Sequence, residues 1–116
     1  GGTRTASITG GYVALELAFK HLISIGVINK IPIIDQVAAV SCGIWRGTSI
    51  LDLDYSEDST ADADANFVLT SDSRIIEIQG TAEKSPFSRK KFNEMLNLAT
   101  KGVGELCVAQ KKALSF

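Results

Sequence analysis

The sequence predicts an α+β fold in which helices pack on one face of a mostly antiparallel sheet. Long helical patterns lie near both ends of the chain, and short strand patterns separated by turn-forming residues lie between them. The order of helix, two hairpins and helix is typical of an α+β sandwich. The 116 residues contain no linker, repeat or low-complexity segment, so we expect one domain spanning residues 1–116.

The first helix is predicted from a stripe of apolar residues that recurs at helical spacing. The stripe consists of Ile8, Tyr12, Leu15, Phe19, Leu22 and Ile23. Because steps of three and four residues place side chains on one face of a helix, this segment should be amphipathic. Ser7 or Thr5 is a candidate cap for its start, and Gly26 is a candidate cap for its end.

The first hairpin is predicted from an apolar run over residues 37–45. The dipeptide Arg46-Gly47 follows it and is suited to a tight turn. The next strand should contain apolar residues as far as Tyr55; these are Ile50, Leu51, Leu53 and Tyr55.

The second hairpin is predicted from residues 66–70 and 75–79, which flank a turn at residues 71–73. Residues 57–65 are expected to form an acidic connection between the hairpins. Gly80 should supply a turn that leaves the last strand.

The last helix has a clear predicted start at Ser88, which is a favourable N-cap residue. Phe87 and Phe92 stand at the spacing of a hydrophobic staple around that cap. Gly102 and Gly104 each disfavour the helix by about 1 kcal/mol relative to alanine. They would therefore either split the helix or allow close packing.

Composition indicates a soluble, cytoplasmic protein. No apolar run approaches the roughly 18 residues that a membrane span needs, and the first ten residues contain no apolar signal-peptide core. Cys42 and Cys107 lie in apolar stretches without metal-ligand spacing, so both should be buried, reduced thiols. His21 should lie on the side of the first helix.

Acidic residues gather in the middle of the chain, although the net charge is only −1. Residues 47–73 contain no Lys or Arg, whereas positive charge lies at 89–91 and 111–112. The acidic residues of that window are Asp52, Asp54, Glu57, Asp58, Asp62, Asp64 and Asp72. Such an edge favours a divalent cation over a bare phosphate.

The N-terminal residues have the chemistry of an anion site. Gly2, Thr3 and Arg4 lead directly into the predicted helix, whose free N–H groups and dipole favour a phosphate. The Arg4 guanidinium adds a fork that matches phosphate oxygens. The alternative is that these small polar residues only cap the helix.

Asp58 and Asp64 are candidate ligands of Mg²⁺, because pairs of carboxylates hold this ion beside substrate phosphates. They flank the acidic connection, where a loop can aim both at one point. Asp52 and Asp54 alternate along the predicted strand and should point away from the core. The alternative is a solvated acidic loop without a ligand.

Four segments in the same order resemble the ribonuclease PH family along essentially the whole chain, as its C-terminal half. They are GGTRTASITG, AAVSCGIWRG, LDLDYSEDS with DAN, and IIEIQGTAE followed by PF. The resemblance implies a ribonuclease PH-like half fold and a phosphorolytic 3′–5′ exoribonuclease, or tRNA nucleotidyltransferase. Such an enzyme uses inorganic phosphate to trim tRNA 3′ ends and releases nucleoside diphosphates.

The resemblance also implies roles for single residues. The family's phosphate-binding Gly-Thr-Arg triplet falls on Gly2, Thr3 and Arg4, and its two metal-associated aspartates fall on Asp58 and Asp64. Mg²⁺ is the implied cofactor, and a homo-oligomeric ring of dimers is the implied assembly.

An N-terminal half is expected to complete the enzyme, and the isolated 116-residue chain is expected to be inactive without it. Two alternatives stay open. The chain could belong to a non-catalytic ring subunit, or it could be an inactive truncated remnant.

Overall fold

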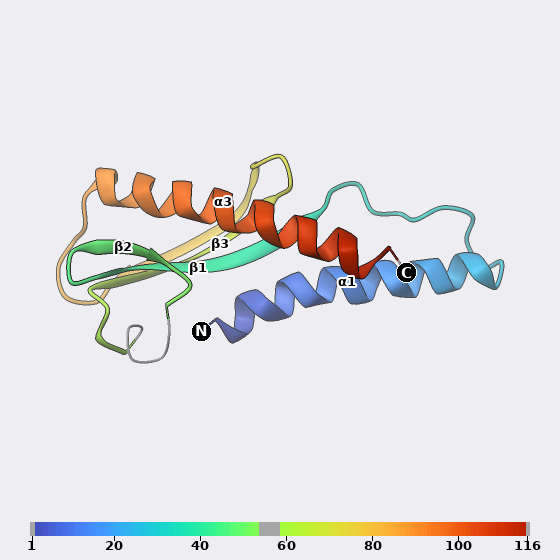
Figure 1. The fold of residues 1–116 in the computed structure, drawn as a ribbon, viewed down its shortest axis with the longest axis horizontal. Coiled ribbons are helices and arrows are strands. Elements are labelled where there is room, and N and C mark those ends of the chain that lie inside the picture. The colour runs from blue at the N-terminus through green and yellow to red at the C-terminus, as the bar shows by residue number, and fades with distance from the viewer. Residues whose placement is uncertain (1, 54–58, 116) are drawn as a thin grey trace.

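The computed structural model describes residues 2–53 and 59–115. Long helices pack beside a small sheet (Figure 1). In chain order the elements are α1 (Thr3–Ser24), β1 (Val37–Trp45), β2 (Thr48–Leu51), β3 (Ala63–Thr70), β4 (Ile75–Ala82) and α3 (Arg89–Ala113). The predicted α+β fold, with helices packed on an antiparallel sheet, is therefore confirmed.

The sheet has the strand order β2-β1-β3-β4, and every described pair is antiparallel. Two rows of cross-strand partners matter for the site. Ser41 of β1 pairs with Asn66 of β3, which pairs with Gln79 of β4. In the next row, Gly43 pairs with Asp64, which pairs with Thr81.

The first hairpin turns where the sequence predicts. Arg46 and Gly47 have φ values of 51° and 77°, as a two-residue hairpin turn of this hand requires. The prediction that the second strand continues through Leu53 is wrong, because β2 ends at Leu51, and Tyr55 lies outside the described residues. Asp52 has a φ of 60°, a left-handed conformation that breaks the strand alternation. Asp52 therefore lies after the strand, and Asp54 lies outside the described residues.

The second hairpin is longer than predicted at both open ends. β3 begins at Ala63, so Asp64 lies in a strand and not in the predicted connection. Gly80 does not turn the chain but pairs with Ala65 inside β4. The ladder continues over these rows, where Ala63 pairs with Ala82 and Ala65 with Gly80.

Helix α3 covers one face of the sheet and forms the core with it. The buried core residues are Ala38, Val40, Cys42, Ile44, Ala63, Ala65, Phe67, Leu69, Met95, Ala99, Val103 and Cys107. The Ser88 hydroxyl accepts a hydrogen bond from the Lys91 N–H, which confirms the predicted N-cap. The helix is continuous through Gly102, where an added Cβ would lie 3.0 Å from a Leu51 methyl carbon. Of the two roles predicted for that glycine, close packing is the correct one.

Helix α1 lies beside β1, where β2 leaves an open length of backbone. The Thr9 hydroxyl accepts from the Ala39 N–H at 3.1 Å and donates to the Ala39 carbonyl at 3.3 Å. Gln110 of α3 donates to the carbonyls of Thr9 and Val37, at 3.1 and 2.9 Å. These bonds tie α1, β1 and α3 together and satisfy polar groups that the incomplete sheet would leave unpaired.

The two ends of α1 differ in how well the sequence predicted them. The proposed caps Ser7 and Thr5 are wrong, because the helix begins at Thr3. Their hydroxyls instead donate to the carbonyls of Thr3 and Gly2. At the other end Gly26 has a φ of 79° and donates its N–H to the Ile23 carbonyl, which confirms the predicted glycine cap.

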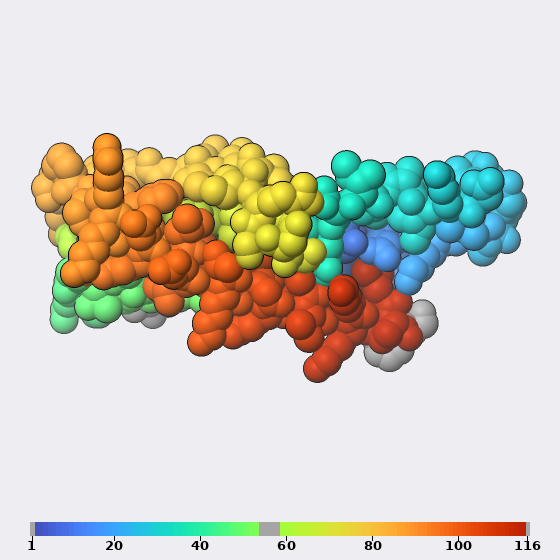
Figure 2. Space-filling model, turned by 90° about the horizontal axis from the view of Figure 1, so that it is seen from above, coloured from blue at the N-terminus to red at the C-terminus, as the bar shows by residue number. Residues whose placement is uncertain are grey.

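The C-terminal part of α1 and the segment after it project beyond the sheet (Figures 1 and 2). The radius of gyration is 16.3 Å, against about 13 Å for a compact domain of this length. Apolar side chains remain exposed on the projection; they are Leu15, Leu17, Ile23, Ile25, Val27 and Ile34. The predicted apolar stripe is therefore only partly covered within these residues.

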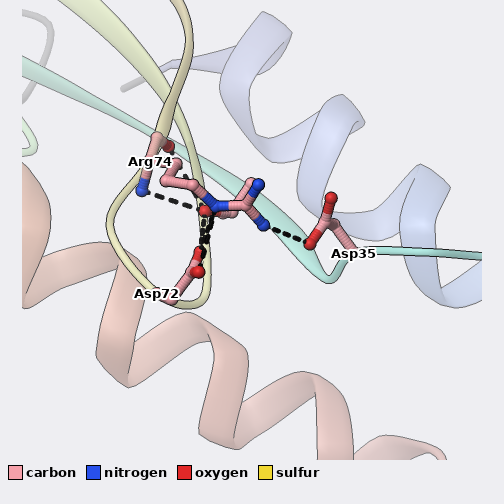
Figure 3. A network of polar contacts seen from close by, with 4 residues as sticks. Asp35, Asp72 and Arg74 are labelled. Atoms are coloured by element: carbon pink, nitrogen blue, oxygen red, sulfur yellow. Dashed lines mark hydrogen bonds and ion pairs between the residues drawn. The ribbon is translucent and has the colours of Figure 1, made fainter.

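Arg74 links the projecting segment to the turn between β3 and β4 (Figure 3). Its guanidinium pairs with Asp35 at 2.5 Å and with Asp72 at 3.0 Å. The pKa of Asp72 lies below its ordinary value, mainly because its carboxylate accepts a hydrogen bond from Thr70. The hydrogen bond from Arg74 adds to this effect. All three charged side chains touch solvent, so the network orients the chain more than it stabilises it.

Both cysteines are free and buried, as predicted. Burial is the main reason that the pKa of Cys42 rises to about 12, and the charge of Asp52 adds to the effect. His21 lies on the exposed side of α1, also as predicted. In the described parts of the chain, no helix is long and apolar enough to cross a membrane.

Candidate functional site

The sheet face opposite α3 carries polar side chains. Strand residues alternate between two faces, so the neighbours of the buried Cys42, Ala65 and Phe67 point the other way. On this open face the cross-strand rows bring together Ser41, Asp64, Asn66, Gln79 and Thr81. The start of α1 lies against the same rows.

A cleft of about 290 Å³ lies between the start of α1 and this open face. Gly2, Thr3 and Arg4 line it from the helix, and Asp64 lines it from β3. Four of the five residues singled out from the sequence thus meet in one cavity. Asp58, the fifth, lies outside the described residues.

Gly2 fixes the helix start against the sheet. Its φ is 89°, and an added Cβ would lie 2.5 Å from the Thr5 hydroxyl oxygen and 3.0 Å from that of Ser41. A side chain at this position would be both strained and too crowded. The Thr5 hydroxyl, which is buried, donates to the Gly2 carbonyl at 2.9 Å. This close approach delivers Thr3 and Arg4 to the cleft.

The helix start offers hydrogen-bond donors to the cleft. The first intrahelical bond runs from the Ala6 N–H to the Gly2 carbonyl, so the N–H groups of Thr3, Arg4 and Thr5 precede the helical ladder. Among the residues that the structure describes, no side chain caps this end of α1. Together with the helix dipole, such N–H groups favour an anion.

Two polar contacts shape the walls of the cleft. The Ser41 hydroxyl donates to the Asn66 side-chain carbonyl at 2.8 Å, so the group that Asn66 can offer to an anion is its amide NH₂. The Arg4 guanidinium forms an ion pair with Glu77 of β4. Asp64 is half-buried beside Asn66 and therefore places a carboxylate within a donor-rich cavity.

The described residues on either side of positions 54–58 contact the sheet. Leu53 is buried, lines the cleft and packs over Gly43, the residue opposite Asp64. On the other side, the Thr60 hydroxyl accepts a hydrogen bond from the Trp45 indole at 2.9 Å. Both flanks of the segment that contains Asp58 are thus anchored to the sheet.

Comparison with known proteins identifies the family. Residues 35–102 match domain 2 of the 3′ exoribonuclease family. The chain belongs to this family. The match covers β1 to β4 and the first half of α3, including Asp64.

Curated relatives within the 3′ exoribonuclease family are ribonuclease PH proteins. The chain is 59% identical over 114 residues to ribonuclease PH of Cereibacter sphaeroides. It is 55% identical over 114 residues to that of Caulobacter vibrioides. Each alignment covers 98% of this chain and 48% of the relative, so the chain spans about half the length of these proteins. The resemblance to the ribonuclease PH family is confirmed.

Solved structures of the same fold come from exosomes. An archaeal exosome core superposes with a TM-score of 0.61 over 70% of this chain and 32% of its own. An Archaeoglobus fulgidus exosome with RNA bound to the active site gives 0.56 over 66% and 30%. Both are 20% identical to this chain, so this likeness concerns the fold.

Sequence reasoning missed four polar residues that line the cleft, namely Ser41, Asn66, Gln79 and Thr81. It also missed Glu77, the ion-pair partner of Arg4. Asn66 stands two residues after Asp64, so the period of two already places both on one face. The residues from β1 and β4 join them only through the register of the sheet, which the sequence does not specify on its own. The roles assigned to Gly2, Thr3, Arg4, Asp58 and Asp64 stay predictions.

Proposed function

We propose that the complete protein is a phosphorolytic 3′–5′ exoribonuclease that trims tRNA 3′ ends and releases nucleoside diphosphates. The chain would supply the catalytic half. One observation carries this proposal: the cationic start of α1, with Thr3 and Arg4, shares a cleft with the carboxylate of Asp64. Family membership supports the same conclusion.

In this proposal inorganic phosphate binds at the start of α1. The Arg4 fork and the Thr3 hydroxyl hold its oxygens, and the N–H groups that precede the helical ladder of α1 add further donors. Gly2, Thr3 and Arg4 are thus the phosphate-binding residues. Donors fixed before the reaction stabilise charge that develops during it, and this is where the closely packed Gly2 contributes.

Mg²⁺ is the proposed cofactor, with Asp64 and Asp58 as its carboxylate ligands. No group of three or more Asp, Glu, His or Cys side chains that could hold a metal occurs in ranges 2–53 and 59–115. Mg²⁺ commonly uses one or two carboxylates together with phosphate oxygens and water, which is the donor set that two aspartates beside a phosphate would offer. When bound, the ion would neutralise charge on the reacting phosphates.

The reaction would proceed by attack of a phosphate oxygen on the phosphorus of the last phosphodiester. The bond from that phosphorus to the 3′-oxygen of the preceding nucleotide breaks, and this oxygen gains a proton. Asp58 or Asp64 is the proposed proton carrier. The products are a nucleoside diphosphate and an RNA shortened by one nucleotide.

The proposed assembly is a homo-oligomeric ring of dimers in the cytoplasm, with RNA as the partner. The N-terminal half of the complete protein would cover the exposed apolar residues of the projecting α1.

The product formed by the complete protein tests this function. An RNA with a short 3′ tail is incubated with Mg²⁺, with and without inorganic phosphate, and the released nucleotides are separated. Nucleoside diphosphates that appear only with phosphate are the expected result. Nucleoside monophosphates would instead indicate hydrolysis, and the absence of any product would favour a non-catalytic ring subunit or an inactive remnant.

A further inference from the structure

We propose that Glu77 is a positioning residue that holds the Arg4 guanidinium so that its remaining N–H groups face the phosphate cleft. This inference rests on the proposed function, because it concerns how the same anion site is kept ready for phosphate.

The location of Glu77 suits this role. Glu77 is the third residue of β4 and lies on the same sheet face as Gln79, two residues before it. Two residues along a strand span about 6.6 Å, so Glu77 stands one step beyond the Gln79 side of the cleft. Arg4 lines the cleft and reaches Glu77 through one terminal nitrogen. The carboxylate therefore grips the guanidinium from the rim.

Because a guanidinium is planar, a contact at one of its nitrogens can fix the orientation of the whole group. The group is planar and carries five N–H donors in a rigid fork. The contact with the Glu77 carboxylate uses the Nη2 corner of Arg4. Holding that corner orients the plane, so the N–H donors that Glu77 leaves free, including those of Nη1, keep fixed directions in the cleft. The ordering cost of a long side chain is met before phosphate arrives.

The exposure of the pair argues against a role in stability. The side chains of Arg4 and Glu77 are 45% and 38% exposed, and ion pairs of this kind add little to the free energy of folding. The ion pair would instead fix the direction in which the Arg4 guanidinium points. A carboxylate that merely competed with phosphate for Arg4 would have the opposite effect, and the sign of the effect on phosphate affinity separates these two roles.

Two substitutions in the complete protein provide the test. Glu77→Gln keeps an oxygen acceptor without the charge, and Glu77→Ala removes the acceptor. We expect Glu77→Ala to raise the KM for phosphate about fivefold. Glu77→Gln should raise it less, and kcat and the KM for RNA should stay within about twofold of wild type in both. Glu83→Ala is the matched control. Glu83 is exposed and follows β4, so its substitution removes the same charge at a nearby position.

The Arg4→Ala background shows whether Glu77 acts through Arg4. In that background Glu77→Ala should have no further effect on the phosphate KM. A phosphate KM that is unchanged or lowered by both Glu77 substitutions would overturn the proposal, as would an equal effect of Glu83→Ala.

Direct titration of inorganic phosphate keeps this inference separable from the proposed function. The dissociation constant of phosphate should rise about fivefold in Glu77→Ala, whether or not the protein turns over RNA. A wild-type protein that binds phosphate but releases no nucleoside diphosphate would refute the function alone. An unchanged dissociation constant in Glu77→Ala would refute the positioning role alone.

Discussion

The two faces of the sheet are built from the same strands but serve different ends. On β3, Ala65 and Phe67 are buried against α3, whereas Asp64 and Asn66 point to the cleft beside α1. One face therefore contributes packing, and the other presents polar groups to solvent and to a ligand. Because the faces alternate residue by residue, neighbouring residues of β3 should respond differently to mutation. Substitution of a core-face residue should lower stability, whereas substitution of an open-face residue should lower activity.

The helices reinforce this division. Helix α3 approaches the core face closely through Gly102, which leaves no room for a Cβ without movement of Leu51. Helix α1 instead meets the sheet with its N-terminal part, through Gly2, Thr5 and Thr9. The open face is thus left accessible while its edge is closed by the helix start.

The largest effect should come from separating this chain from the rest of the protein. We expect the isolated 116 residues to self-associate through the exposed apolar side chains of α1 and to show no phosphorolysis. Sedimentation velocity, together with the phosphate-dependent trimming assay, measures both properties. Adding the N-terminal half as a second chain should restore part of the activity. A monomeric chain that trims RNA by itself would contradict this expectation.

On the open face, Asp64→Asn in the complete protein should lower phosphorolysis by at least about 100-fold, as losses of transition-state stabilisation often do. Asp58→Asn should do the same. The free energy of unfolding should change by less than about 1 kcal/mol, because Asp64 is only half-buried. Turnover assays and denaturant unfolding would measure the two quantities. Near-normal turnover by both variants would show that neither aspartate belongs to the site.

On the core face, Phe67→Ala should show the reverse pattern. Phe67 is fully buried and its ring centroid lies 6.1 Å from that of Phe92. Its removal should cost about 3–5 kcal/mol of stability, and Phe67→Leu should cost less. At low temperature the protein that remains folded should keep its phosphate KM. A selective loss of phosphate affinity would show that the two faces are coupled.

The buried thiol of the core face should give the smallest effect, as a dependence on pH. The pKa of Cys42 is about 12 in the folded chain, above its ordinary value of 9.0, so the unfolded thiol ionises first. Its stabilising contribution is complete below about pH 9 and is lost as the pH rises toward 12. The free energy of unfolding of wild type should therefore fall more steeply with rising pH than that of Cys42→Ala. Parallel curves from pH 9 to 11 would contradict the burial argument.

The sequence could predict the fold because its patterns are local. The Arg46-Gly47 turn, the Ser88 cap and the Gly26 cap each depend on residues that neighbour one another. The ends of β2 and β4 were mispredicted because tertiary contacts set them. Asp52 adopts a left-handed conformation after β2, and Gly80 stays in β4, where it pairs with Ala65 of β3.

The candidate site was only partly predictable for the same reason. Gly2, Thr3, Arg4 and Asp64 carry recognisable chemistry in the sequence, and the fold brings them into one cleft. Glu77 reaches Arg4 from 73 residues away, through the register of β4. No spacing in the chain signals such a contact, so it became visible only in the folded structure.

The central claim is that the start of α1 binds phosphate on the open face of the sheet, and Arg4→Lys tests it most directly. Lysine keeps the positive charge but loses the planar fork. In the complete protein we expect the KM for inorganic phosphate to rise about tenfold, with RNA affinity changed by less than about twofold. The opposite outcome, a collapse of RNA affinity with unchanged dependence on phosphate, would place Arg4 on the RNA path and contradict the account.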